Sequence, residues 1–177
     1  ASKYGLTIDN DKFVYDSGIP GSIYGNQLAG IGREDGSNIH TKAQSAGILT
    51  VSNASDLGNT EYLMFGHDNA GIAGWTTTEA PNSGSNTKRI AREWRMRETG
   101  DVGSINFELD VTSLPPLPAG YTQYAVWIDS DGDFSNGAVM YQTTLTGSEY
   151  IASAVTIANG DYVTLGIIKP EIQFVST

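Results

Sequence analysis

The sequence predicts an all-β protein that folds as an antiparallel β-sandwich or jelly roll. Glycine occurs 21 times and charged residues make up only 17% of the 177 residues. Glycine-rich turns between β-branched runs are typical of short strands and hairpins. One run alternates apolar and polar side chains without a fault, which is the period of a strand with one buried face. The sequence contains no long amphipathic helix pattern and no internal repeat.

The alternating run lies at residues 105–112 and is the clearest predicted strand. Its apolar members are Ile105, Phe107, Leu109 and Val111, and its polar members are Asn106, Glu108, Asp110 and Thr112. We expect the first set to face the core and the second set to face water. The strand should end before Pro115-Pro116, because proline cannot donate a hydrogen bond to a neighbouring strand.

Further strands are predicted from short β-branched and aromatic runs at residues 27–31, 47–52, 61–65, 89–98, 123–129, 139–145, 153–158 and 162–168. Asn159-Gly160 separates the last two runs, and a two-residue Asn-Gly loop favours the type I′ turn of a β-hairpin. About nine short strands separated by turn residues indicate a sandwich or jelly roll. Residues 70–87 form a long connection that is rich in small polar residues and contains Trp75.

Length and charge narrow the class of protein. A chain of 177 residues fits one domain, and it has no cysteine for a disulfide. The formal net charge is -10, so nucleic acid and anionic membranes would be repelled and are not expected partners. No apolar run approaches the roughly 18 residues of a membrane span, so we expect no membrane insertion.

Several segments together resemble a module of very large bacterial surface and secreted proteins, especially those of the Bacteroidetes. These segments are KYGLT at 3–7, GIGRED at 30–35, EYLMFGHDN at 61–69, TTEAP at 77–81, AREWR at 91–95, ETGDVG at 98–103, DSDGDF at 129–134 and GDYVTLG at 160–166. The resemblance covers nearly the whole chain and brings no assigned activity with it.

The resemblance implies a place within a longer polypeptide. In such proteins the module often follows a concanavalin-like lectin domain, and the start of this chain resembles that junction. The final segment PEIQFVST at 170–177 resembles the opening strand of a Calx-β repeat. We therefore expect one module at residues 1–168, followed at 169–177 by a linker or the first strand of a Calx-β-like domain. The implied setting is an extracellular adhesin or filament whose partners are neighbouring domains, cell-surface glycans or other protein subunits.

The segment DSDGDFSN at residues 129–136 is the strongest candidate site. Its carboxylates alternate along the chain, and its glycine allows a sharp bend, so the side chains can converge on a hard cation. The predicted ligands of a Ca²⁺ ion are Asp129, Asp131, Asp133, Ser135 and Asn136, since calcium prefers six to eight oxygen ligands. The spacing is not that of an EF-hand. The alternative is an acidic, solvated hairpin turn.

A second candidate site follows the apolar run at residues 62–65. His67, Asp68 and Asn69 stand at the start of the long connection that contains Trp75. The indole ring could stack on a sugar while the polar groups bond its hydroxyls. Alternatively, Asp68 and Asn69 form a turn capped by His67, and Trp75 pins the connection to the core.

Half of the ten Lys and Arg residues lie between Lys88 and Arg97. If Trp94 faces the core, strand alternation also turns Arg92 inward. A buried guanidinium needs a carboxylate or carbonyl partner, so we expect Arg92 to be a structural, paired arginine. The alternative is an anion-binding strip.

Catalysis is not expected. The chain has no thiol and no Gly-x-Ser-x-Gly motif, and its only histidines are His40 and His67. We expect a non-catalytic structural or adhesive β-sandwich module, stabilised by calcium, on the bacterial cell surface or secreted. The alternatives are a carbohydrate-binding module and, third, a glycan-active hydrolase domain.

Overall fold

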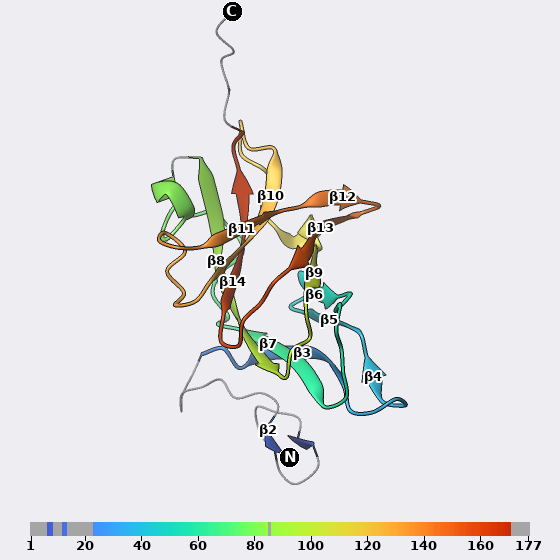
Figure 1. Cartoon of the computed structure of the whole chain (residues 1–177). Helices are drawn as coiled ribbons and strands as arrows, with labels where there is room; N and C mark the ends of the chain where they lie inside the picture. The colour runs from blue at the N-terminus through green and yellow to red at the C-terminus, as the bar shows by residue number, and fades with distance from the viewer. Residues whose placement is uncertain (1–6, 9–11, 14–22, 85, 171–177) are drawn as a thin grey trace, which may run out of the picture.

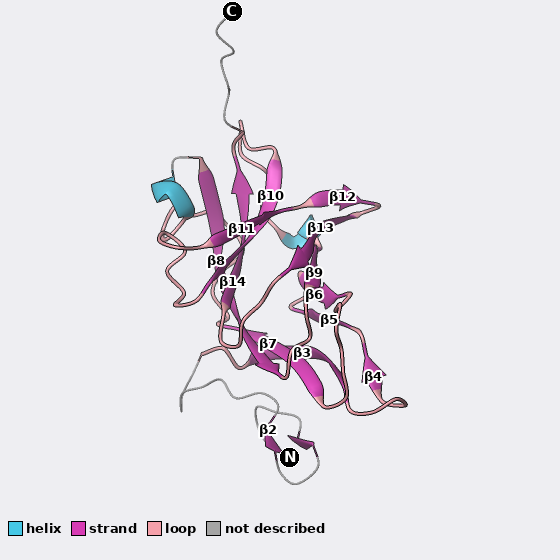
Figure 2. Cartoon of the chain, in the orientation of Figure 1, coloured by secondary structure: helices cyan, strands magenta, loops and turns pink. Residues whose placement is uncertain are grey.

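The computed structural model describes residues 7–8, 12–13, 23–84 and 86–170 of the chain. Its strands form two antiparallel sheets that pack as a sandwich, which confirms the predicted fold class (Figure 1). The described helices are two short 3-10 turns, η1 (Pro81–Gly84) and η2 (Val111–Ser113), as Figure 2 shows. None of the described helices is long and apolar enough to cross a membrane. The junction residues 3–6 and 171–177 lie outside the described part of the chain.

The larger sheet has seven strands and carries most of the candidate sites. In spatial order these are β11 (Val139–Gln142), β10 (Gln123–Asp129), β14 (Tyr162–Ile168), β8 (Thr87–Thr99), β7 (Glu61–His67), β3 (Asn26–Arg33) and β4 (Ile39–His40). The long strand β8 lies at the centre, and every pairing in the sheet is antiparallel.

The smaller sheet has five strands. In spatial order these are β12 (Thr144–Thr146), β13 (Glu149–Val155), β9 (Ile105–Leu109), β6 (Leu49–Ser52) and β5 (Lys42–Ser45). A separate two-stranded sheet pairs β1 (Thr7–Ile8) with β2 (Lys12–Phe13). The predicted strands at 123–129 and 162–168 agree with β10 and β14 at both ends.

On each side of the sandwich, the chain passes from one sheet directly into the other. β4 leads through Thr41 into β5, and β11 leads through Thr143 into β12. Thr143 is buried, and both its N–H (3.2 Å) and its hydroxyl (2.8 Å) donate to the carbonyl oxygen of Tyr124. The predicted strand at 139–145 is therefore divided between the two sheets, and this transition holds their edges together.

The core lies between the sheets. Ile105, Phe107 and Leu109 on β9 are fully buried, as the alternation predicts. The strand ends at Leu109 rather than near the prolines, because the Asp110 carboxylate accepts the backbone N–H of Thr112 at 2.9 Å and caps η2. Val111 therefore leaves the strand and is only partly buried.

The predicted Asn159-Gly160 hairpin is wrong. A turn does form there, with the N–H of Asp161 donating to the carbonyl of Ala158 at 3.1 Å. However, β13 and β14 belong to different sheets, so the turn connects the two layers. The strand predicted at 153–158 begins earlier and ends earlier, as β13. β5 and the two-residue strand β4 were not predicted, because they are short and largely polar.

A second, smaller core lies on the outer face of the seven-stranded sheet. It contains Ala125, Trp127 and Phe134, all buried. Trp127 lies directly over Gly166, where an added Cβ atom would overlap the indole ring at its Cζ3 atom. The connection from β10 to β11 brings Phe134 back onto this face, and it contains the predicted calcium loop.

Candidate functional site

Asp129 ends β10 on the outer face of the seven-stranded sheet, two residues after Trp127. Its side chain is buried, with 5% of the residue exposed. One carboxylate oxygen, Oδ1, accepts the backbone N–H groups of Asp131 (2.8 Å) and Gly132 (2.9 Å). Gly132 has a φ of 90°, a conformation that favours glycine. The carboxylate of Asp129 therefore bends the chain back at the end of the strand.

The next two carboxylates repeat this arrangement along the loop. Asp131 Oδ1 accepts the N–H of Asp133 at 2.9 Å, and Asp133 Oδ1 accepts the N–H (3.0 Å) and hydroxyl (2.6 Å) of Ser135. The N–H of Asn136 donates to the carbonyl of Asp133 at 3.2 Å. This chain of turns agrees with the acidic-turn alternative and also positions Phe134 on the sheet.

The carboxyl groups of Asp129 and Asp131 lie together and influence each other. Burial raises the pKa of Asp129, and a hydrogen bond with the Asp131 carboxyl raises it further. The backbone N–H of Asp133 and the same carboxyl contact lower the pKa of Asp131. Among the residues that the structure describes, no group of three or more acidic, His or Cys side chains could hold a metal ion. Two of the predicted calcium carboxylates are thus brought together, and Asp133 bonds Ser135 instead.

A buried ion-pair cluster occupies the centre of the same outer face. Arg89 on β8 is 3% exposed. Its guanidinium forms ion pairs with Glu79 (2.6 Å) and Glu93 (3.0 Å), and its Nε donates to the carbonyl of Thr78 at 3.0 Å. These contacts hold the connection at residues 70–87 against the sheet.

The cluster extends to other segments of the chain. The hydroxyl of Tyr24 donates to Glu93 at 2.9 Å, and the Arg89 guanidinium lies 5.1 Å from the centre of the Phe134 ring. Burial raises the pKa of Glu93, while the Tyr24 hydrogen bond and the Arg89 charge act in the opposite direction. Burial and the Glu93 carboxylate raise the pKa of Tyr24.

Arg92 does not have the deeply buried, carboxylate-paired position that the sequence predicts. It is partly buried, and its Nε donates to the carbonyl of Ala70 at 3.0 Å. The reason is an irregularity in β8, where the register against β14 shifts between Glu93 and Arg89. This shift breaks the strict alternation around Arg92. Arg89 lies with Glu93 on the outer face and is the buried, paired arginine.

The residues proposed for glycan binding have structural roles. His67 is buried beside Trp94, with the ring centres 6.0 Å apart, and its Nδ1 accepts the N–H of Asn69 at 2.9 Å. Burial lowers the pKa of His67. Asp68 Oδ1 accepts the N–H groups of Ala70 (3.0 Å) and Glu93 (3.2 Å). This geometry is the capped turn that the sequence offered as the alternative.

Trp75 packs against the core. Its ring centre lies 6.3 Å from that of Tyr124, and its indole N–H donates to the carbonyl of Pro116 at 3.1 Å. The ring therefore fastens the long connection to the sandwich. His67 is buried, so the four proposed residues do not share one exposed surface.

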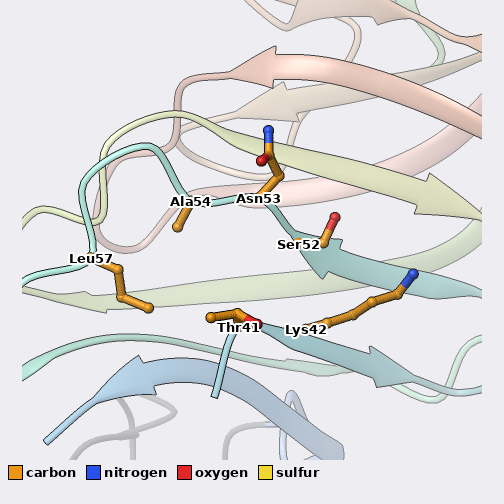
Figure 3. Close-up of a pocket in the computed structure, with 6 residues that line it drawn as sticks. All are labelled: Thr41, Lys42, Ser52, Asn53, Ala54 and Leu57. Carbon is orange, nitrogen blue, oxygen red and sulfur yellow. The ribbon is translucent and has the colours of Figure 1, made fainter. Parts of the chain in front are cut away.

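One cavity opens beside the β4–β5 transition, with a volume of about 380 Å³. Figure 3 shows its lining, which comes from the β4–β5 link, β5, β6 and the connection after β6: Thr41, Lys42, Ser52, Asn53, Ala54 and Leu57. Lys42 and Ser52 also bond the buried Glu108, each at 2.5 Å. Burial opposes ionisation of Glu108, but these two hydrogen bonds lower its pKa. Lys42 and Ser52 at this cavity are therefore already paired.

A second cavity, of about 390 Å³, lies beside β11 at the opposite side of the sandwich. Its lining residues are Ile128, Asp129, Ser130, Gly137, Val139, Tyr141, Thr156, Ala158 and Asp161. Burial raises the pKa of Asp161, although its Oδ2 accepts the N–H of Ala158 at 2.8 Å.

Sequence reasoning missed this cavity and the Arg89 cluster, because both join segments far apart in the chain. Asp161 directly follows the Asn159-Gly160 turn, and this position was the sequence signal available for it.

Comparison with known proteins adds a family but no activity. No curated protein and no solved structure matches the chain. A family model described as a domain of unknown function matches residues 1–161. The chain therefore belongs to the DUF8202 family.

Proposed function

We propose that the chain is a non-catalytic structural and adhesive β-sandwich module of a large extracellular bacterial surface protein or filament, and that calcium stabilises it. The proposal rests on the contacts that the buried charged side chains make. In the described part of the chain these are Arg89, Glu93, Glu108 and Asp129. Arg89, Glu93 and Glu108 each bond another segment of the chain, and Asp129 holds the turn that follows it.

The links made by these charges span the sequence. Glu93 bonds Tyr24, 69 positions away, and Glu108 bonds Lys42, 66 positions away. Burying a charge without a partner is costly. The stability of the fold therefore depends on these contacts between distant segments. Such cross-linking suits a module that must keep its shape between neighbouring domains. The sequence resemblance to modules of large surface proteins supports the same setting.

Calcium fits the donor chemistry of the Asp129 loop. Asp129 and Asp131 present neighbouring carboxylates, and carboxylate and carbonyl oxygens are the ligands that calcium prefers. Close carboxylates repel one another, and a divalent cation would remove that repulsion. Asp133, Ser135 and Asn136 would contribute further oxygens. The net charge of -10 favours cation binding in general.

Thermal unfolding of the full chain with calcium and with a chelator tests the calcium part. Extracellular modules bind calcium with dissociation constants of about 10⁻⁴–10⁻³ M. Calcium at about ten times that value should raise the Tm by about 3–6 °C. Asp131→Asn should abolish the response. Asp35→Asn is a matched control, because Asp35 also accepts two backbone N–H groups in an exposed acidic turn. Identical melting curves with calcium and chelator, starting from metal-free protein, contradict calcium binding.

The non-catalytic, adhesive part has its own tests. Incubation with a panel of polysaccharides should release no new reducing ends, and release that requires the folded chain would contradict the proposal. Deletion of the module from its parent protein should weaken attachment of the cells or their filaments to a surface. Unchanged attachment with normal export of the parent protein would argue against an adhesive role.

A further inference from the structure

The outer edge of β11 is open to another strand. β11 is the last strand of the seven-stranded sheet, and it pairs with β10 on one side. No described strand pairs with its other side. The N–H of Thr143 bonds β10, and antiparallel strands alternate the direction of their backbone groups. The N–H and C=O groups of Met140 and Gln142 therefore point away from the sheet.

Nothing in the sequence of β11 protects this edge. Natural sheets block open edges with charged side chains, prolines or bulges. β11 has the sequence VMYQ, and its pairing with β10 is regular. Val139 and Met140 are 54% and 42% exposed, and Leu145 on the adjoining β12 is 56% exposed. By contrast, β5 at the edge of the smaller sheet carries Lys42.

The cavity beside β11 adds a second recognition element. Val139 and Tyr141 line it from β11 itself, and Asp161 lines it from the connection between β13 and β14. Side chains along a strand alternate between its two faces. Every second side chain of a strand added to β11 would therefore face the side on which the cavity opens.

We propose that β11 and this cavity form a docking site for an extended basic peptide segment of a partner protein. The segment adds to the seven-stranded sheet as an eighth strand, and one of its Lys or Arg side chains enters the cavity and pairs with Asp161. Strand addition of this kind obtains affinity from backbone hydrogen bonds and specificity from pockets for alternate side chains.

Charge and shape favour a basic side chain in the cavity. Ile128, Val139 and Tyr141 offer an apolar wall for the aliphatic stem, and Asp161 offers a carboxylate for the charged end. The Asp161 carboxylate forms no ion pair with a described Lys or Arg side chain. A chain of net charge -10 also attracts a basic partner and repels a second copy of itself.

Selection from a random linear peptide library displayed on phage tests the proposal with the full 177-residue chain. Enriched peptides should contain Lys or Arg at a recurring position within a β-branched run. The most enriched peptide, made synthetically, should shift the backbone amide NMR signals of β11 when it binds. A selection without enrichment, or peptides without a basic residue, would overturn the proposal.

Two variants separate the parts of the site. Asp161→Asn should weaken binding of the selected peptide by at least about ten-fold, as expected for loss of a paired interfacial charge. Gln142→Pro removes an outward N–H and should weaken binding to a similar degree, whereas Gln142→Thr should not. Asp35→Asn is the control for a carboxylate outside the cavity, because Asp35 lies in a separate exposed turn. Equal affinity for wild type and Asp161→Asn would contradict the proposal.

Two further measurements separate this proposal from the calcium proposal and from pairing of the edge with a second copy. Binding measured with a chelator present should match binding with calcium, so that a failure of the calcium proposal leaves this result intact. Sedimentation of the wild type should give a monomer. A wild-type dimer that Gln142→Pro converts to a monomer would assign the edge to a second copy and overturn the peptide proposal.

Discussion

Arg89 and Glu93 lie four positions apart on the same strand, yet their side chains form an ion pair of 3.0 Å on the outer face of the sheet. In a regular strand, four residues advance the chain by about 13 Å. The register shift of β8 against β14 between these residues changes that spacing. This irregularity places a buried arginine between two carboxylates and over the Phe134 ring. The outer layer of the sandwich is organised around that contact.

We predict that Arg89→Met destabilises the fold much more than Arg92→Met. Removing Arg89 leaves buried Glu93 without its cation, which typically costs about 3–5 kcal/mol. Arg92 loses one hydrogen bond to the carbonyl of Ala70, worth about 1 kcal/mol. Urea unfolding of both variants measures the difference in the free energy of unfolding. Equal losses, or a larger loss for Arg92→Met, would contradict the assignment of Arg89 as the paired arginine.

Gly166→Ala should be strongly destabilising, because its Cβ atom would overlap the Trp127 ring. Overpacking of this kind costs about 1–3 kcal/mol or more. Gly36→Ala is the matched control, since no atom lies within 4 Å of the added Cβ atom. It should change the free energy of unfolding by less than about 0.5 kcal/mol. If Gly166→Ala is as stable as the control, then Trp127 does not lie over that glycine.

Trp75→Ala should lower stability, because the indole packs against Tyr124 and the core. For a partly buried aromatic side chain we expect a loss of about 2 kcal/mol, below the 3–5 kcal/mol of a fully buried one. Trp75→Phe should retain most of the packing and lose about 1 kcal/mol with the hydrogen bond to Pro116. Thermal unfolding and glycan-array binding are measured on the same samples. Unchanged stability together with lost glycan binding would favour the carbohydrate-binding alternative.

Asp161→Asn should raise stability at neutral pH in the absence of a partner. Burial raises the pKa of Asp161 above that of the unfolded chain, so the folded state binds the proton more tightly. The contribution of Asp161 to stability therefore falls as the pH rises from the unfolded pKa through the folded pKa. The asparagine carries no such charge and keeps an acceptor for the Ala158 N–H.

The measurement for Asp161 is urea unfolding of both proteins across the acidic range. The advantage of Asp161→Asn should be largest at neutral pH and should shrink as the pH falls toward about 4, the usual carboxyl pKa. Asp35→Asn is the opposite control, since backbone N–H groups lower the pKa of Asp35. That variant should lose stability at neutral pH. An Asp161→Asn difference that does not depend on pH would rule out a buried, penalised carboxylate.

The sequence correctly predicted the strands whose burial and ends follow from residues close together in the chain. β9 has three fully buried residues at alternate positions, and the alternating sequence is sufficient to identify them. β10 and β14 are bounded by turn residues and were predicted at both ends. The bend at Asp129 was also predictable, because Asp and Gly at that spacing bond the adjacent backbone.

Other features depend on which strands become neighbours. The sequence at 139–145 indicates one strand, but the hydrogen bonds of Thr143 to Tyr124 divide it between two sheets. Asn159-Gly160 indicates a hairpin, but its two flanking strands pair with β9 and β10 instead of with each other. Neither pairing is visible locally, because the partners are distant in the chain.

By itself, the sequence determined an all-β chain, the inward face of β9 and the bend after β10, since each follows from side chains a few residues apart. Only the tertiary structure decided that Arg89 rather than Arg92 is buried and paired, and that Asp161 faces a cavity beside an open edge. The physical reason is that burial and charge pairing depend on strand register. One irregular pairing between β8 and β14 changes which side chain meets which partner.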